Sequence, residues 1–235
     1  MCIRDRDSVI TLFPFEENAY KNSNVRTCYA GHPIAYRLNQ DQKELIKRKE
    51  AKSIALLPGS RKSEISLLAD EMIRAAKELS RKDESYKFYM PLSDKNHLAL
   101  INEPLEDLIK VSFDNSQEVL SNCEIGIITS GTATLESLLL RTPCVTLYKT
   151  GWLSYRIIKP LLSIDNFSLP NLLAGGELLP ELLQDEVNTE NIIKAIDKMN
   201  LKGLDFYYKE FHAIHENLKA GSSETAAKEV FNLID

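Results

Sequence analysis

Ser53-Ile-Ala-Leu-Leu-Pro-Gly-Ser-Arg61 is the stretch that decides the fold class of this chain. It opens with a short apolar run that Pro58 and Gly59 end, which is typical of a buried strand. After the turn, apolar residues recur at spacings of three and one and form a single stripe: Ile65, Leu68, Ala69, Met72, Ile73, Ala76 and Leu79. Such a stripe predicts an amphipathic helix. A buried strand that leads through a glycine turn into a helix favours a parallel α/β sheet.

The alternation of strands and helices continues beyond this unit. We expect strands at 86–90, 109–113, 124–129 and 144–148. Helices should separate them, at 95–102, 116–121 and 133–141. After Gly151 the pattern changes: an apolar segment runs to Leu162, and an irregular stretch is expected from there through Gly175. Strands that alternate with helices in this order indicate a parallel α/β sheet.

The pattern divides the chain into three parts. Residues 1–47 carry expected strands at 9–13 and 25–29 and end in charged sequence that suits a linker or a surface helix. Residues 48–186 hold the alternating strands and helices. In residues 187–235 helical patterns dominate, and we expect these helices to pack back on the first part or against a partner subunit.

Composition limits the classes of function. The chain has 235 residues, 43% of them hydrophobic and 27% charged, which is ordinary for a globular protein. Its net charge of -5 gives no indication of nucleic-acid binding, which usually requires a basic excess. No apolar run approaches the ~20 residues of a membrane span. Four separated cysteines without a C-x-x-C pair predict free thiols, a reducing compartment such as the cytoplasm, and no zinc site: Cys2, Cys28, Cys123 and Cys144.

The first candidate site is the turn after the strand Ser53–Leu57. Gly59 permits close backbone approach, and Ser60 can cap the following helix. The helix N-terminus offers free N–H groups to a phosphate, and Arg61 adds a planar charged donor. The competing interpretation is a capped strand-to-helix turn with a solvated arginine.

The second candidate site is Ser130-Gly131-Thr132, between the expected strand 124–129 and the helix 133–141. Glycine and hydroxyl groups again meet a helix N-terminus. Glu136 lies one turn after Thr132 on the same helical face, where its carboxylate could accept hydrogen bonds from ribose hydroxyls. Alternatively, Glu136 only interacts favourably with the helix dipole.

Neither loop has the pattern of a Walker A motif or of the Gly-x-Gly-x-x-Gly dinucleotide fingerprint. In a parallel sheet both loops lie at the carboxyl edge, where ligands bind. Two separate phosphate-type loops at that edge suit a nucleoside diphosphate.

The residues of these loops resemble the lipid-A-disaccharide synthase family. Motifs in family order run from about residue 8 to the C-terminus: Phe13-Pro-Phe-Glu16, Gly31-His-Pro33, Ile54-Ala-Leu-Leu-Pro-Gly-Ser-Arg61, Ser130-Gly-Thr-Ala-Thr-Leu-Glu136, Ser168-Leu-Pro-Asn-Leu-Leu-Ala-Gly175 and Pro180-Glu-Leu-Leu-Gln-Asp185. The resemblance implies a GT-B glycosyltransferase with two Rossmann-like domains and the active site between them. Residues 48–186 would then be the UDP-sugar-binding domain, and residues 1–47 a remnant of the acceptor-side domain.

The resemblance also implies a reaction. The family is a hexosyltransferase that transfers 2,3-diacylglucosamine from its UDP conjugate to 2,3-diacylglucosamine 1-phosphate, forms a β-1,6 linkage and releases UDP. It acts at the cytoplasmic face of the inner membrane as a peripheral protein, without a metal or other cofactor, and a homodimer is among the expected partners. Protein groups would therefore stabilise the charge on the departing UDP.

Site residues follow from the resemblance, motif by motif. Arg61, Glu136 and Asn171 match family positions important for activity, which makes them the catalytic candidates. The expected UDP-sugar contacts are Gly59, Ser60, Arg61, Ser130, Gly131, Thr132 and Glu136. For Asn171, the competing role is to hold its own loop through backbone hydrogen bonds.

The chain departs from the family pattern at its N-terminus. The family has a further stretch of more than a hundred residues there, which carries the carboxylate expected to act as general base. We therefore expect this chain to be truncated and to bind the sugar donor without efficient turnover.

Several other residues invite functional interpretation. His32 sits in the Gly-His-Pro turn and could touch substrate, while His212 and His215 are expected at the surface. The apolar and basic segment from Trp152 to Lys159 could contact acyl chains or anionic lipid, although helix packing is slightly favoured.

Two other functions remain open. A UDP-sugar 2-epimerase shares the architecture but needs acid–base groups around the sugar, and no such cluster is evident. A non-catalytic nucleotide-binding module is the second alternative, and failure to bind UDP would leave only a structural role for the loops.

Overall fold

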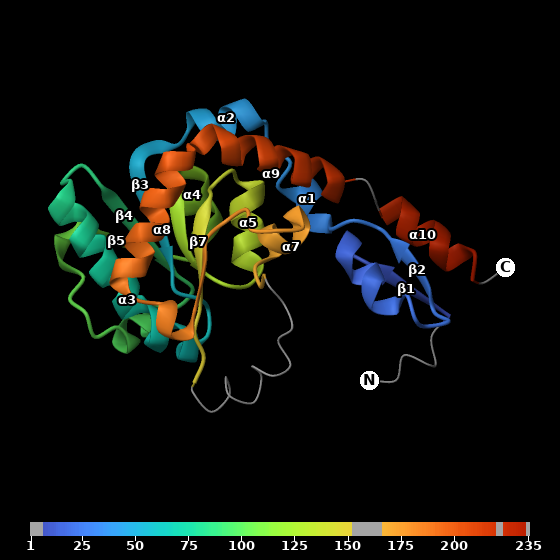
Figure 1. The fold of residues 1–235 in the computed structure, drawn as a ribbon, viewed down its shortest axis with the longest axis horizontal. Coiled ribbons are helices and arrows are strands. Elements are labelled where there is room, and N and C mark those ends of the chain that lie inside the picture. The colour runs from blue at the N-terminus through green and yellow to red at the C-terminus, as the bar shows by residue number, and fades with distance from the viewer. Residues whose placement is uncertain (1–6, 152–165, 220–222, 234–235) are drawn as a thin grey trace.

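The computed structural model describes residues 7–151, 166–219 and 223–233. Its centre is a parallel six-stranded sheet with the strand order β5-β4-β3-β6-β7-β8 (Figure 1). The strands are β3 (Glu50–Leu57), β4 (Lys87–Leu92), β5 (Ile109–Phe113), β6 (Cys123–Thr129), β7 (Cys144–Tyr148) and β8 (Glu181–Leu183). The expected parallel α/β sheet is therefore confirmed.

Helices cover both faces of this sheet. Helix α3 (Lys62–Lys82) packs with α8 (Thr189–Lys202) on one face, and α4 (Ser116–Asn122) packs with α5 (Thr132–Leu139) on the other. Helix α3 forms because its apolar stripe is fully buried, from Ile65 to Leu79. The central strand β3 is buried from Ser53 to Leu57, which places the opening motif in the core.

The strand order fixes where a ligand can bind. From β3 the chain moves to β4 and β5 on one side, then crosses to β6 and β7 on the other side. The chain thus leaves β3 and β6 in opposite directions across the sheet, so their carboxyl ends form a topological switch point. Loops diverge at such a point and open a crevice for ligands.

In a second, smaller sheet, β1 (Ser8–Thr11) and β2 (Arg26–Tyr29) pair in parallel. A 3-10 helix, η2 (Pro14–Tyr20), connects them. Helix α10 (Ser223–Phe231) returns to this sheet (Figure 1). Its nearly buried Glu229 accepts a hydrogen bond from Ser8 Oγ at 2.9 Å and pairs with Arg26 Nε at 3.0 Å.

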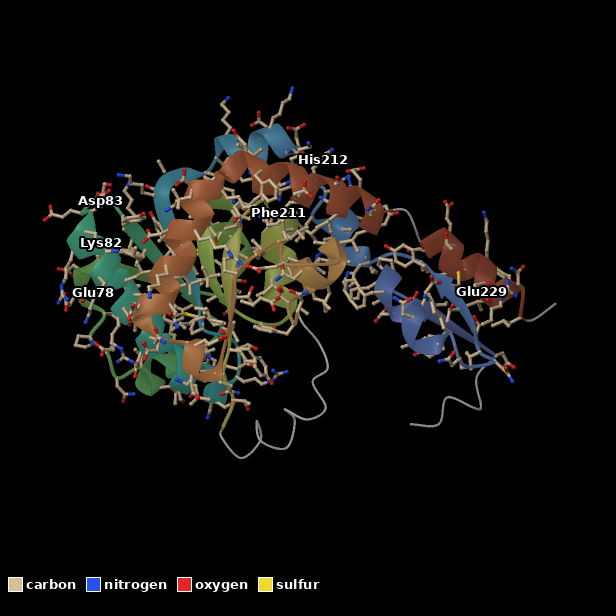
Figure 2. All side chains as sticks on the ribbon, in the orientation of Figure 1. Glu78, Lys82, Asp83, Phe211, His212 and Glu229 are labelled. Atoms are coloured by element: carbon tan, nitrogen blue, oxygen red, sulfur yellow. The ribbon has the colours of Figure 1, made fainter. Side chains whose placement is uncertain are left out.

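The last long helix, α9 (Leu204–Leu218), carries His215, whose buried side chain contacts both the segment before the six-stranded sheet and the turn after α5. Nε2 of His215 lies 2.8 Å from the carbonyl oxygen of Ala35 in α1 (Pro33–Arg37), and Nδ1 lies 3.2 Å from Nη2 of buried Arg141. The expected surface position of His215 is therefore wrong. His212 is exposed as expected, and Figure 2 shows it directed outward while Phe211 is directed into the core.

The structure can be compared with the predictions for the cysteines, for a membrane span, for a metal site and for the segment from Trp152 to Lys159. Cys123 and Cys144 are buried free thiols, as predicted, and burial raises the pKa of Cys123 to about 12. Within the described residues, no helix has the length and apolar character to cross a membrane, and no group of three or more metal-ligating side chains gathers. The segment from Trp152 to Lys159 lies outside the described residues.

Candidate functional site

A cavity of about 520 Å³ lies at the switch point, against the carboxyl ends of β3, β4, β5 and β6. Its wall contains the residues predicted to bind the UDP-sugar: Gly59, Ser60, Arg61, Ser130, Gly131, Thr132 and Glu136. The two loops come together because β3 and β6 are neighbours, with Leu57 opposite Ile128. Two helix N-termini, those of α3 and α5, therefore face one cavity.

The first loop carries an anion of its own. Arg61, not Ser60, is the N-cap of α3, and Glu64 forms the capping box with it. Glu64 Oε2 accepts hydrogen bonds from the backbone amides of Ser60 and Arg61, both at 3.2 Å. Its Oε1 lies 2.6 Å from Nη1 of Arg61. The predicted capping role of Ser60 is wrong, because the carboxylate of Glu64 fills this position.

The second loop is open. Gly131 is the N-cap of α5 and has a φ of 153°, a conformation that side chains disfavour. Its carbonyl accepts from Thr134, while Ser130 N donates to Leu147 O at 2.8 Å. Within the described part of the chain, no hydrogen bond uses the amides of Gly131, Thr132 or Ala133. These three N–H groups are available to an anion at the positive end of α5.

Glu136 is the acidic group on the same helix. It lies in the second turn of α5 and lines the cavity, as its spacing from Thr132 predicted. Its Oε1 accepts a hydrogen bond from Nε2 of Gln117 at 2.9 Å. Gln117 belongs to α4, the neighbouring helix on this face of the sheet.

A third loop completes the wall and was missed by sequence analysis. Asp114 and Ser116 follow β5 and line the cavity beside Pro91 and Leu92 of β4. Asp114 adopts a φ of 55° and its amide donates to Leu92 O at 3.0 Å. Asp-Asn after a strand is a turn signal, and the sequence pattern alone could have raised it as a candidate.

The electrostatics of the cavity depend on one cation. Among the described wall residues, Arg61 alone carries a permanent positive charge, and its side chain is 79% exposed. Glu64, Asp114 and Glu136 contribute carboxylates. A diphosphate in this cavity would therefore depend on Arg61 and on the free amides of the α5 N-terminus.

Comparison with known proteins shows the family to which the chain belongs. A family profile described as lipid-A-disaccharide synthetase matches residues 3–233. The chain belongs to the lipid-A-disaccharide synthetase family. The lipid-A-disaccharide synthase of Pseudoalteromonas translucida is 36% identical over 240 residues, which cover 97% of this chain and 62% of that protein. The synthase of Idiomarina loihiensis is 33% identical over 232 residues, or 94% of this chain and 61% of the relative. The chain thus spans about three-fifths of the length of these relatives.

Solved structures show that this member of the lipid-A-disaccharide synthetase family has a GT-B-type fold. The spinosyn rhamnosyltransferase SpnG aligns with a TM-score of 0.56 at 16% identity, over 79% of this chain and 46% of SpnG. The wall teichoic acid polymerase TagF aligns with a TM-score of 0.50 at 15% identity, over 97% of this chain and 57% of TagF. At these identities the likeness concerns the fold alone.

Asn171, the third catalytic candidate from the family motifs, is not on the wall of this cavity. It is fully buried in α7 (Leu169–Ala174). Its Oδ1 accepts from the amides of Leu178 and Leu179 at 3.0 and 2.8 Å, and its Nδ2 donates to Leu179 O and Glu181. The structure thus shows the loop-holding contacts of Asn171, and its part in the reaction stays a prediction.

His32, also in a family motif, has a clear structural role. It is the N-cap of α1, where its Nδ1 accepts from the amide of Ile34 at 3.2 Å. Its ring stacks on Phe13, with the centroids 5.1 Å apart. Burial lowers the pKa of His32, against the opposing effect of Glu16. This histidine stabilises the turn and lies outside the wall of the main cavity.

Proposed function

We propose that the cavity binds the UDP part of a UDP-linked sugar and that the chain supplies the sugar-donor side of a glycosyltransferase in lipid A biosynthesis. The observation that carries this proposal is the meeting of two helix N-termini, Arg61 and Glu136 in one cavity at the switch point. Family membership supports the same assignment. SpnG, which shares the fold, has also been solved with thymidine diphosphate.

The full reaction proposed is the transfer of 2,3-diacylglucosamine from its UDP conjugate to 2,3-diacylglucosamine 1-phosphate, with a β-1,6 linkage formed and UDP released. As the glycosidic bond to UDP breaks, negative charge grows on the diphosphate. The free amides of Gly131, Thr132 and Ala133 and the guanidinium of Arg61 are placed to stabilise it. This chain's part in the reaction is therefore to bind the sugar donor and to stabilise the leaving group.

The lipid nature of both substrates supports a peripheral position on the inner face of the cytoplasmic membrane. A homodimer is proposed on the basis of the family resemblance. The 2-epimerase alternative requires acid–base carboxylates and histidines around the sugar, and the described wall of the cavity carries three carboxylates but no histidine.

A titration calorimetry series tests the nucleotide assignment. The purified chain is titrated with UDP, UMP and uridine. We expect UDP to bind at least tenfold more tightly than UMP, because the second phosphate gains charge-assisted hydrogen bonds. Equal affinities for UDP and uridine, or no binding of UDP, would refute a diphosphate site and support a non-catalytic module.

A further inference from the structure

The carboxylate of Glu136 is held from outside the cavity. Its only hydrogen-bond partner in the described part of the chain is the side-chain amide of Gln117, with Nε2 2.9 Å from Oε1. Gln117 is the second residue of α4, and Glu136 lies in the second turn of α5. Glu136 is on the cavity wall, whereas Gln117 is not. Gln117 would thus act on a ligand only through Glu136.

One of the two oxygens of the Glu136 carboxylate can accept hydrogen bonds from a ligand. Oε1 is engaged by Gln117, and no described residue donates to Oε2. A glutamate has three side-chain torsions, and fixing them on ligand binding costs free energy. A carboxylate already held by a neutral amide avoids part of that cost and keeps its charge for the ligand. Charge-assisted bonds from hydroxyl groups to such an oxygen are stronger than bonds between neutral groups.

The position of Glu136 selects the part of the ligand that it meets. It lies one turn along α5 from the open amides of Gly131 and Thr132, on the same face. The diphosphate of a UDP-sugar carries a ribose on one side and the sugar on the other, and the proposed function assigns the ribose to the side of Glu136. A ribose presents two neighbouring hydroxyl groups, which suit a fixed carboxylate acceptor.

We propose that Gln117 is a positioning residue that orients the carboxylate of Glu136 toward the ribose hydroxyls and thereby sets the preference for ribonucleotides over deoxyribonucleotides. This inference rests on the proposed function, because it requires a nucleoside diphosphate in the cavity. It adds a residue outside the cavity wall that determines specificity.

Affinities for UDP and for 2′-deoxyuridine 5′-diphosphate test this role by calorimetry. The unmodified chain should prefer UDP by at least about tenfold, the lower end of the value of one hydrogen bond to a charged group. Gln117→Met keeps the volume of the side chain but removes the amide donor. It should weaken UDP binding by about three- to tenfold and leave the deoxy analogue little changed, so that the ratio falls toward one. Glu136→Ala gives the ratio of the two affinities, for UDP and for the deoxy analogue, when the carboxylate is absent.

Two further variants make the result decisive. Glu118→Ala changes the exposed neighbour of Gln117 on the same helix and should leave the ratio unchanged. Gln117→Ser also removes the contact and serves as a second test if the methionine variant does not fold, as judged by its thermal unfolding.

The outcomes separate this inference from the proposed function. If the unmodified chain does not bind UDP, both fail. If it binds UDP but shows no preference for the ribose, the inference fails and the diphosphate site stands. Equal weakening of UDP and the deoxy analogue in Gln117→Met would indicate a merely structural role and overturn the inference.

Discussion

The carboxylate of Glu64 pairs with the guanidinium of Arg61 across the first turn of α3, with Oε1 2.6 Å from Nη1. Its other oxygen accepts from the amides of Ser60 and Arg61. The first loop therefore already contains an anion where a phosphate was predicted. A ligand phosphate must displace Glu64 to bind Arg61. The amides of the second loop have no acceptor among the described residues that a phosphate would have to displace.

Glu64→Gln should strengthen UDP binding. Glutamine can still cap α3, but it no longer neutralises Arg61. The pair is exposed on the arginine side and is worth about 0–1 kcal/mol, so the expected gain in affinity is roughly two- to fivefold. Glu78→Gln is the matched control, because Glu78 pairs with Arg81 at the same spacing far along α3. Weaker UDP binding in Glu64→Gln would instead show that Glu64 organises Arg61 for the ligand.

Gly131→Ala should disturb the second loop through the backbone alone. Gly131 has a φ of 153°, and a Cβ there would meet no atom within 4 Å. The expected cost is about 1–3 kcal/mol, seen as lower stability, as a displaced loop with weaker UDP binding, or as both. Calorimetry and thermal unfolding measure the two effects.

Gly203→Ala provides the control for this backbone effect. Gly203 also has positive φ, 84°, with open space around it, but it joins α8 to α9. It should lose stability while UDP binding stays unchanged. If both glycine variants bind UDP like the unmodified chain, the conformation of Gly131 is not needed for the site.

The central sheet was predictable because its strands are short apolar runs between turns. The bounds of β5 and β7 agree with prediction to the residue, and β3 begins three residues earlier than expected, at half-buried Glu50 before exposed Ala51 and Lys52. Sequence analysis missed β8, which has three residues, and α7, a six-residue helix with Pro170 in its first turn. Elements this short have too few residues to show a period.

The candidate site was predictable where glycine and hydroxyl residues join a strand to a helix. The two loops met as expected because parallel strands share a carboxyl edge. The partners of these loops were not predictable, since Gln117 meets Glu136 across 19 residues of sequence. The burial of His215 was missed for the same reason: its partners Ala35 and Arg141 are 180 and 74 residues away.

Asn171→Ala should lower the free energy of unfolding. The change leaves the amides of Leu178 and Leu179 and the carbonyl of Leu179 without their partner in a buried loop. At about 1–3 kcal/mol for each unpaired group, we expect a loss of at least 3 kcal/mol in denaturant unfolding. Asn102→Ala, which removes an exposed contact to Asp70, should cost less than 1 kcal/mol. Unchanged stability in Asn171→Ala would contradict the loop-holding role of these contacts.

Acid should destabilise the chain through His215. Burial lowers the pKa of His215, and the nearby Arg141 lowers it further, against the hydrogen bond to Ala35. As the pH falls, a histidine in the unfolded chain, with a pKa near 6.5, therefore binds a proton at a higher pH than His215 does in the folded chain. This contribution to stability is complete above about pH 6.5 and is lost as the pH falls toward the lower folded pKa.

Urea unfolding at pH 7.5 and pH 5.5 measures this effect. The difference in unfolding free energy between the two pH values should shrink in His215→Gln and persist in His212→Gln, whose side chain is exposed. An identical pH dependence in the unmodified chain and in His215→Gln would mean that other groups titrate in this window.

The most direct test of the nucleotide site is calorimetric titration of UDP into the unmodified chain, Arg61→Ala, Glu136→Ala and Arg81→Ala. Arg81 lies on the same helix, is also exposed and also pairs with a glutamate three residues away, so its variant controls for lost surface charge. We predict that Arg61→Ala and Glu136→Ala each weaken binding by about ten- to a hundredfold, while Arg81→Ala binds as the unmodified chain does. Unchanged affinity in both cavity variants would contradict the assignment of this cavity to UDP.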